Sequence, residues 1–172
     1  DSDAEDIDSF DTDGFTVTQA TYDDYNDAND TYVAWSWKLN GGTTSTNNDG
    51  SLTSTVQANQ NSGVSIILYT GGGSAGDTIG HGLSAAPTMV WFKRRDANGN
   101  WMVYVKSMGG DGYINLDRTN GKDTGGSPVN NTDPSSSVIT LGSFQSLNNN
   151  TNSYIAYAFH SVEGFTKVGQ YV

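Results

Sequence analysis

The chain has 172 residues, no cysteine and a formal net charge of −11 at pH 7. Its length is that of one β-sandwich of ordinary or slightly larger size, and the lack of Cys excludes a disulfide framework and thiol chemistry. The acidic balance argues against a nucleic-acid partner, because phosphate binding requires a basic face. No run of about 18 apolar residues occurs, so we expect no membrane insertion.

The residue pattern favours β-structure throughout. Gly, Asn, Ser, Thr and Asp are abundant, and no window repeats apolar residues with helical spacing over three turns. Short alternating runs are separated by Gly-rich and Asn-rich turns instead, which is typical of strands. We therefore predict an all-β fold, an antiparallel β-sandwich of jelly-roll or lectin-like type with about ten strands.

The N-terminal region is strongly acidic: residues 1–30 hold 11 of the 19 acidic residues and no Lys or Arg. One interpretation is a solvated arm; the other is a calcium site. Asp8, Asp11 and Asp13 place oxygen ligands at near-alternating positions, as calcium loops do, although the remaining EF-hand elements are missing. Asp96, Asn98 and Asn100 form a similar cluster, and such clusters are also ordinary in turns. No other cofactor is predicted.

The chain opens without Met, and residues 1–6 have neither the basic nor the apolar region of a signal peptide, so we expect a processed product or an excerpt of a longer polypeptide. Residues 1–14 are predicted to be irregular and residues 15–18 a short strand. Residues 30–38 alternate Val and Trp with smaller or polar residues and predict an aromatic strand. We interpret residues 1–38 as an acidic arm plus the closing strands of a partial repeat unit.

The aromatic strand has an echo at residues 152–160, which repeat its pattern of hydroxyl residue, Tyr, β-branched residue, Ala and alternating aromatics. Two such segments predict equivalent strands of repeated units. Residues 39–51 have the composition of a linker. Residues 52–61 favour an edge strand, so we expect a linker and edge segment over residues 39–62.

The remainder, residues 63–160, is predicted to be one complete β-sandwich unit. Within it, residues 88–95 and 101–106 flank an Asn98–Gly99 tip and predict a hairpin. Further strands are expected at the following ranges: 63–69, 78–81, 112–116, 137–141 and 152–160. In the last segment, 161–172, residues 164–171 resemble residues 63–69 with one residue inserted, which predicts the opening strand of a further unit or an oligomer contact.

The predicted hairpin supplies the main candidate binding site. We expect a stripe of Trp91, Lys93 and Tyr104 on an outer face, where the rings stack on a sugar. Arg94, Arg95 and Asp96 are then available to hydrogen-bond the sugar hydroxyls. The alternative interpretation is that these aromatic side chains face a second sheet or a subunit interface.

Catalytic signatures do not appear. There is no G-x-S-x-G motif, no phosphate-binding loop and no Cys nucleophile, and a carboxylate pair for glycoside cleavage is defined only by its spacing in three dimensions. His81, between two glycines, is predicted to be a turn histidine that makes a hydrogen bond rather than a zinc ligand. We expect no enzymatic activity.

Several motifs together resemble a repeat module of structural proteins from marine tailed bacteriophages. They are Gly80-His-Gly-Leu83, Pro87-Thr-Met-Val90, Lys93, Trp101, Tyr104, Tyr154-x-Ala-Tyr-x-Phe159 and Gly164-Phe-x-Lys167. Phe10-Asp-x-Asp-Gly-Phe-Thr-Val17 and Tyr32-Val-Ala-Trp-x-Trp-Lys38 resemble the close of a preceding module. The resemblance offers no catalytic residues.

What the resemblance implies is an oligomeric tail-fibre or virion-surface protein that is located outside the cell and binds a host surface glycan. The alternative is a purely structural filament or capsid-decoration subunit that assembles through its terminal strands. Its partners are then further copies or a neighbouring virion protein. In that case the acidic arm is expected to pair with Lys93, Arg94 and Arg95 of the next subunit.

Overall fold

The computed structural model describes residues 7–17, 26, 29–37, 39 and 43–169. The chain divides into two compact units, Asp1–Trp37 and Lys38–Val172. Eleven strands are present in the described residues, and all the pairings between them are antiparallel. The longest described helix has four residues, which is far too short to cross a bilayer. The predicted all-β antiparallel class is confirmed.

The N-terminal unit contains one described hairpin. Strand β1 (Ile7–Phe10) pairs with β2 (Phe15–Val17), and Phe10 lies opposite Phe15. The irregular structure predicted for residues 1–14 is therefore wrong at β1. Residues 1–6 of the acidic arm lie outside the described residues.

The aromatic strand predicted at residues 30–38 is also wrong. Residues 30–37 have no regular secondary structure, and Lys38 lies outside the described residues. Val33 and Trp35 are 68% and 66% exposed. A strand exists only where a neighbour accepts its backbone hydrogen bonds, and the hairpin is the only described sheet of this unit. The alternating pattern of residues 30–37 therefore has no partner strand among the described residues.

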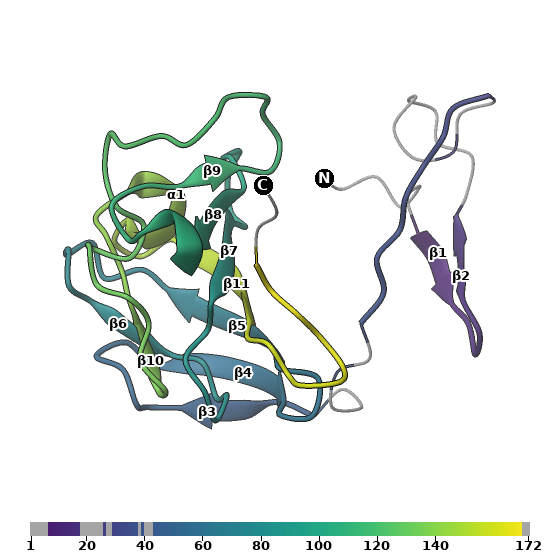
Figure 1. The fold of residues 1–172 in the computed structure, drawn as a ribbon, viewed down its shortest axis with the longest axis horizontal. Helices are drawn as coiled ribbons and strands as arrows, with labels where there is room; N and C mark the ends of the chain where they lie inside the picture. Colours follow the sequence, from purple (N-terminus) through teal and green to yellow (C-terminus); the bar gives the residue numbers. More distant parts are fainter. Residues whose placement is uncertain (1–6, 18–25, 27–28, 38, 40–42, 170–172) are drawn as a thin grey trace. The chain divides into compact units, whose positions relative to one another are not determined.

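The larger unit is built on one seven-stranded antiparallel sheet, the main sheet, with the order β3-β4-β5-β11-β7-β8-β9 (Figure 1). Val, Ile, Tyr and Phe dominate its long central strands, as expected for a pleated, half-buried surface. The strands are β3 (Ser45–Asn47), β4 (Ser54–Asn59), β5 (Val64–Thr70), β7 (Met89–Arg94), β8 (Met102–Val105), β9 (Ile114–Asn115) and β11 (Ser153–Phe159). Strand β11 lies between β5 and β7.

A second layer covers one face of the main sheet and makes the fold a β-sandwich. It contains β6 (Thr78–Gly80) paired with β10 (Val138–Thr140), and the short helix α1 (Gln145–Asn148) (Figure 1). A 3-10 turn, Lys106–Met108, follows β8. The fully buried core joins the two layers through Ile67, Phe92, Tyr104, Tyr154 and Ala156 of the main sheet and Ile79, Val129, Ile139, Leu141 and Leu147 of the second layer.

The side chain of Asn148 ties α1 to the loop that precedes β6. It is fully buried, and its Oδ1 accepts hydrogen bonds from the N–H groups of Gly72 (2.9 Å) and Gly73 (3.4 Å). Its Nδ2 donates to the oxygens of Ser74 (2.9 Å), Asp77 (3.1 Å) and Gly142 (3.1 Å). A single amide thus satisfies polar groups from two chain segments, the 72–77 loop and Gly142.

The predicted domain boundaries need correction at both ends of the 63–160 unit. The predicted edge segment is present, because β3 and β4 form one edge of the main sheet, but residues 45–59 belong to that sheet rather than to a linker. Backbone hydrogen bonds from Ser51 to the Thr78 hydroxyl (2.7 Å) and from Leu52 to the Thr78 carbonyl (2.9 Å) hold this segment, and Val56 of β4 adds a buried apolar side chain to the core. Beyond β11, residues 161–169 form only an isolated bridge between Val162 and Thr166 rather than a strand; residues 170–172 lie outside the described residues.

Candidate ligand-binding face

The main sheet presents a second surface, the outer face, on the side opposite the core. Side chains alternate between the two faces along each strand, and the core-side row of Ile67, Ala156 and Phe92 is fully buried. The rows on either side of it therefore point outward. One row crosses the sheet through Ile66, Tyr157, Trp91 and Val103, and the next through Thr55, Leu68, Ile155 and Lys93.

An aromatic cluster lies at the centre of the outer face. The ring centroids of Trp91 and Tyr157 are 6.4 Å apart, those of Trp101 and Tyr157 are 6.0 Å apart, and those of Trp91 and Phe159 are 5.0 Å apart. All three pairs are tilted, within the separations at which aromatic rings attract each other. Trp91, Trp101 and Tyr157 remain partly exposed, so the cluster forms an accessible aromatic surface.

Two cationic side chains follow Trp91 on the same side of the β7 segment, at the alternate positions Lys93 and Arg95. The Lys93 Nζ donates to the carbonyl oxygen of Gly99 at 2.5 Å, and the Arg95 backbone N–H donates to Ser153 at 2.9 Å. Arg95 is exposed. Its charge acts on Tyr157: burial raises the pKa of the Tyr157 phenol, and the positive charge of Arg95 partly opposes that rise.

A hollow of about 220 Å³ opens beside Arg95. Its lining is predominantly polar: Thr53, Thr55, Leu68, Tyr69, Thr70, Arg95, Ser153 and Tyr154. Four of these residues, Thr55, Leu68, Thr70 and Ser153, belong to the outer rows of β4, β5 and β11. The volume is below the roughly 300–1,000 Å³ of sites for drug-sized ligands, so the hollow fits one small polar ring or group.

The structure separates the six residues predicted to bind a sugar. Trp91, Lys93 and Arg95 lie together on the outer face, whereas Tyr104 is fully buried on the core side. The predicted stripe of Trp91 and Tyr104 is therefore wrong. The hairpin register pairs Trp91 with Val103 and Val90 with Tyr104, which assigns Tyr104 to the opposite face.

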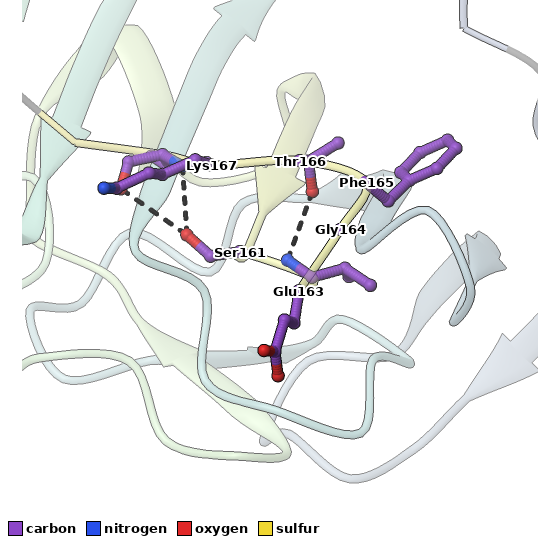
Figure 2. Close-up of a pocket in the computed structure, with 8 residues that line it drawn as sticks. Ser161, Glu163, Gly164, Phe165, Thr166 and Lys167 are labelled. Atoms are coloured by element: carbon purple, nitrogen blue, oxygen red, sulfur yellow. Dashed lines mark hydrogen bonds between the residues drawn. The ribbon is translucent and has the colours of Figure 1, made fainter.

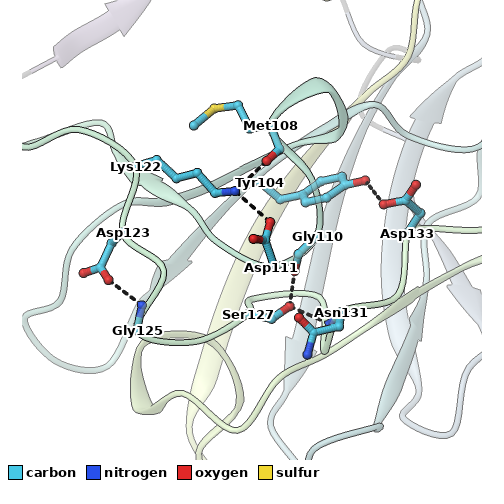
Figure 3. A network of polar contacts seen from close by, with 10 residues as sticks. All are labelled: Tyr104, Met108, Gly110, Asp111, Lys122, Asp123, Gly125, Ser127, Asn131 and Asp133. Atoms are coloured by element: carbon cyan, nitrogen blue, oxygen red, sulfur yellow. Dashed lines mark hydrogen bonds and ion pairs between the residues drawn. The ribbon is translucent and has the colours of Figure 1, made fainter.

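Tyr104 belongs instead to a polar network beneath the 3-10 turn (Figure 3). Its hydroxyl donates to Asp133 at 2.8 Å, and the same carboxylate lies 4.0 Å from the Lys106 Nζ. Burial and the bond to Asp133 raise the pKa of the Tyr104 phenol well above its usual range. In the same region the Lys122 Nζ contacts Asp111 at 2.7 Å. This network holds loops together on the core side and does not contribute to the outer face.

Arg94 and Asp96 bind each other at the hairpin tip. The Arg94 Nε donates to Asp96 at 2.6 Å, and the second Asp96 oxygen accepts the Ser153 N–H at 3.1 Å. The hydrogen bond from Arg94 lowers the pKa of the Asp96 carboxyl. Both side chains are thus engaged in fixing the tip to β11.

Trp101 and Tyr157 were not among the predicted binding residues. Tyr157 was assigned only to the predicted repeat strand at residues 152–160, and the predicted stripe grouped Trp91 with Tyr104 instead of Trp101. A register for the 88–95 and 101–106 hairpin would have identified Trp101, because residues opposite each other share a face. Tyr157 carried no such local signal, since β11 meets β7 only through the tertiary pairing.

A hollow of about 680 Å³ lies within the C-terminal turn (Figure 2). Its lining is one consecutive segment, residues 161–168. That turn is closed by hydrogen bonds from the Val162 N–H to Thr166 Oγ1 (3.3 Å) and from the Val168 N–H to Ser161 Oγ (3.0 Å). No second element converges on this hollow in the described structure, so we do not assign it a ligand.

The calcium ligands proposed at Asp8, Asp11 and Asp13 are not brought together. The two carboxylate oxygens of Asp11 accept hydrogen bonds from the hydroxyls of Ser9 (3.0 Å) and Thr16 (2.9 Å) within the hairpin. No three acidic, His or Cys side chains among the described residues are grouped as metal ligands.

His81 is fully buried beneath the turn that follows β6. Its Nε2 donates to the Ser135 carbonyl (3.2 Å), and its Nδ1 accepts the Leu83 N–H (3.1 Å). This confirms the predicted hydrogen-bonding turn histidine. The two bonds require the neutral ring, and burial lowers the pKa of His81.

Comparison with known proteins identifies a family but no activity. Residues 1–172 match a family model described as a domain of unknown function (DUF7483). No curated protein and no solved structure matches the chain.

Proposed function

The chain belongs to the DUF7483 family, and we propose that it is a non-enzymatic adhesion module of a phage tail fibre or virion surface that binds a host glycan on its outer face. The phage setting comes from the sequence motifs described above. The binding role comes from the composition of the outer face.

The observation that supports glycan binding is the pairing of an aromatic cluster with a polar hollow on one sheet surface. Trp91, Trp101 and Tyr157 present partly exposed rings, and the ring centroids of Trp91 and Trp101 lie 6.4 and 6.0 Å from that of Tyr157. Sugar rings carry apolar C–H faces that pack on such rings, while their hydroxyls require polar partners. The hydroxyls of Thr55, Thr70 and Ser153 line the adjacent hollow and supply those partners.

The experiment is a glycan-array screen followed by affinity measurement with Trp101 variants. Trp101→Ala removes the exposed end of the cluster, and we expect it to weaken glycan binding at least about tenfold, or about 1.4 kcal/mol. Trp101→Phe keeps an aromatic ring and is expected to retain most of the affinity. Phe165→Ala is the matched control, because Phe165 is 68% exposed on the same unit but lies in the C-terminal turn.

Each variant is checked by circular dichroism and thermal unfolding, so that a loss of affinity is not a loss of fold. Binding that is equal in wild type and in Trp101→Ala would remove the outer face from the proposal. Absence of binding to any glycan on the array would refute the adhesion role.

The second candidate, a structural subunit that assembles with copies of itself, is favoured by a different observation. Nine large hydrophobic side chains are exposed in the described structure, and seven of them lie in the Asp1–Trp37 unit: Ile7, Phe10, Phe15, Tyr32, Val33, Trp35 and Trp37. A concentration of exposed apolar side chains in one unit favours an interaction role for that unit.

Light scattering tests this assembly role. If the exposed residues mediate assembly, Trp35→Ser combined with Trp37→Ser is expected to reduce the measured mass of the particles, whereas Phe165→Ser is not. A wild-type chain that stays monomeric over the whole accessible concentration range would exclude assembly through this surface.

A further inference from the structure

The outer face carries positive charge that forms no ion pair with a carboxylate of the described residues. In the described part of the chain the ion pairs are Arg94–Asp96, Lys106–Asp133 and Lys122–Asp111. Lys93 and Arg95 are in none of them. Lys93 donates to a neutral carbonyl, and the Arg95 side chain is exposed beside the hollow. In a protein with a net charge of −11 this arrangement points to an anionic ligand.

The positions of these cations follow from the strand period. Trp91, Lys93 and Arg95 alternate with Phe92 and Arg94, so the two unneutralised cations and the aromatic ring share the outer side. Arg94, on the other side, is the one that Asp96 neutralises at 2.6 Å. The positive charge on the outer face therefore comes from the alternate positions Lys93 and Arg95, and it does not reflect a general excess of basic residues in the chain.

We infer that the outer face binds acidic glycans, with the Arg95 guanidinium holding a carboxylate or sulfate group of the sugar. This inference rests on the proposed adhesion function and adds the class of ligand. A guanidinium presents paired N–H donors that match the two oxygens of a carboxylate, whereas neutral sugars offer no such partner. The hydroxyls of Thr55, Thr70 and Ser153 around the same hollow accept or donate to the ring hydroxyls.

An acidic peptide would also satisfy the positive charge, and the acidic N-terminal segment of a second copy is one such peptide. The neighbouring groups favour a sugar instead. Three rings, Trp91, Trp101 and Tyr157, form an aromatic surface next to a hydroxyl-lined hollow. That surface suits the stacked apolar face of a pyranose better than an extended chain of Asp and Asn.

The test compares polysaccharides that differ only in charge. The probes are polygalacturonate and its methyl ester, hyaluronan and its carboxyl-reduced form, and dextran sulfate and dextran. Affinities are measured at low and at high ionic strength for the wild-type chain, for Arg95→Gln and for Lys106→Gln. The last variant removes the same charge at the opposite end of β8, far along the strand from Trp101.

For at least one of these pairs, wild type is expected to bind the charged form more tightly, with an affinity that falls as salt rises. Arg95→Gln is expected to weaken binding of that charged form about tenfold and to change binding of the neutral form by less than about twofold. Lys106→Gln is expected to leave both affinities unchanged.

Equal wild-type affinity for the charged and neutral forms, or no binding of any charged probe, would overturn the acidic-glycan inference. Binding of neutral glycans that Trp101→Ala abolishes would still support the proposed function. An equal loss of both forms in Arg95→Gln would overturn the role of charge. Self-association of wild type that Arg95→Gln abolishes would identify the acidic segment of a second copy as the occupant and would likewise overturn the inference.

Discussion

Replacing Asn148 by Ala is expected to destabilise the larger unit substantially. The amide is fully buried and is the sole side-chain link between α1 and the loop of residues 71–77 among the described hydrogen bonds. Its loss leaves the N–H of Gly72 and the carbonyl of Gly142 without their side-chain partner. Each buried group left unsatisfied costs about 1–3 kcal/mol, and water entering beside the partly buried ones reduces the sum, so we expect a loss of about 2–4 kcal/mol.

The assay is urea unfolding followed by circular dichroism, comparing midpoints at unchanged slope. Asn148→Asp is the informative control, because it keeps an acceptor for Gly72 but loses both donors and places a carboxylate next to Asp77, whose oxygen lies 3.1 Å from the Asn148 Nδ2. Asn148→Asp is expected to be at least as unstable as the Ala variant at neutral pH and to recover relative to wild type on acidification. A loss below about 0.5 kcal/mol for Asn148→Ala would refute the reasoning.

Three further predictions concern other sites. Because the folded-state pKa of His81 is lowered and its Nδ1 accepts the Leu83 N–H, its contribution to stability is complete above its unfolded pKa of about 6.5 and is lost as the pH falls below that value; His81→Gln should flatten the dependence of the unfolding midpoint on pH in this range. Gly50→Ala should lower the melting temperature, with a cost of about 1–3 kcal/mol, because its Cβ would overlap a backbone carbonyl of β6, whereas Gly121→Ala meets open space and should be neutral. Tyr104→Phe should reduce stability by about 1 kcal/mol through the lost carboxylate hydrogen bond but leave glycan affinity unchanged.

The strands that could be predicted from sequence are those with strong local patterns. Residues 63–69 and the 88–95 and 101–106 hairpin appear as β5, β7 and β8, because β-branched and aromatic residues alternate there between clear turns. Strand β3 could not be predicted, since Ser45–Asn47 has no apolar residue. Backbone pairing to β4 holds it in the sheet.

The candidate site could be predicted only in part, because local residue patterns determine some of its positions and strand pairing determines the others. Period two places Trp91, Lys93 and Arg95 on one side of a strand from local sequence alone. Whether Tyr104 joins them depends on hairpin register, and a shift by one residue moves a side chain to the opposite face. That Tyr157 completes the cluster depends on the pairing of β11 with β7, which are about 60 residues apart in the chain.

Two segments with the same residue pattern show most clearly what the sequence determines and what the tertiary structure determines. Residues 30–38 and 152–160 match position by position, and by itself the sequence determined the all-β class and a strong strand preference at both. Only the tertiary structure decided their outcomes: β11 is hydrogen-bonded on both sides by β5 and β7, whereas residues 30–37 are exposed and irregular. A strand is stabilised by the partners that satisfy its backbone and cover its side chains, and those partners are not encoded within the segment itself.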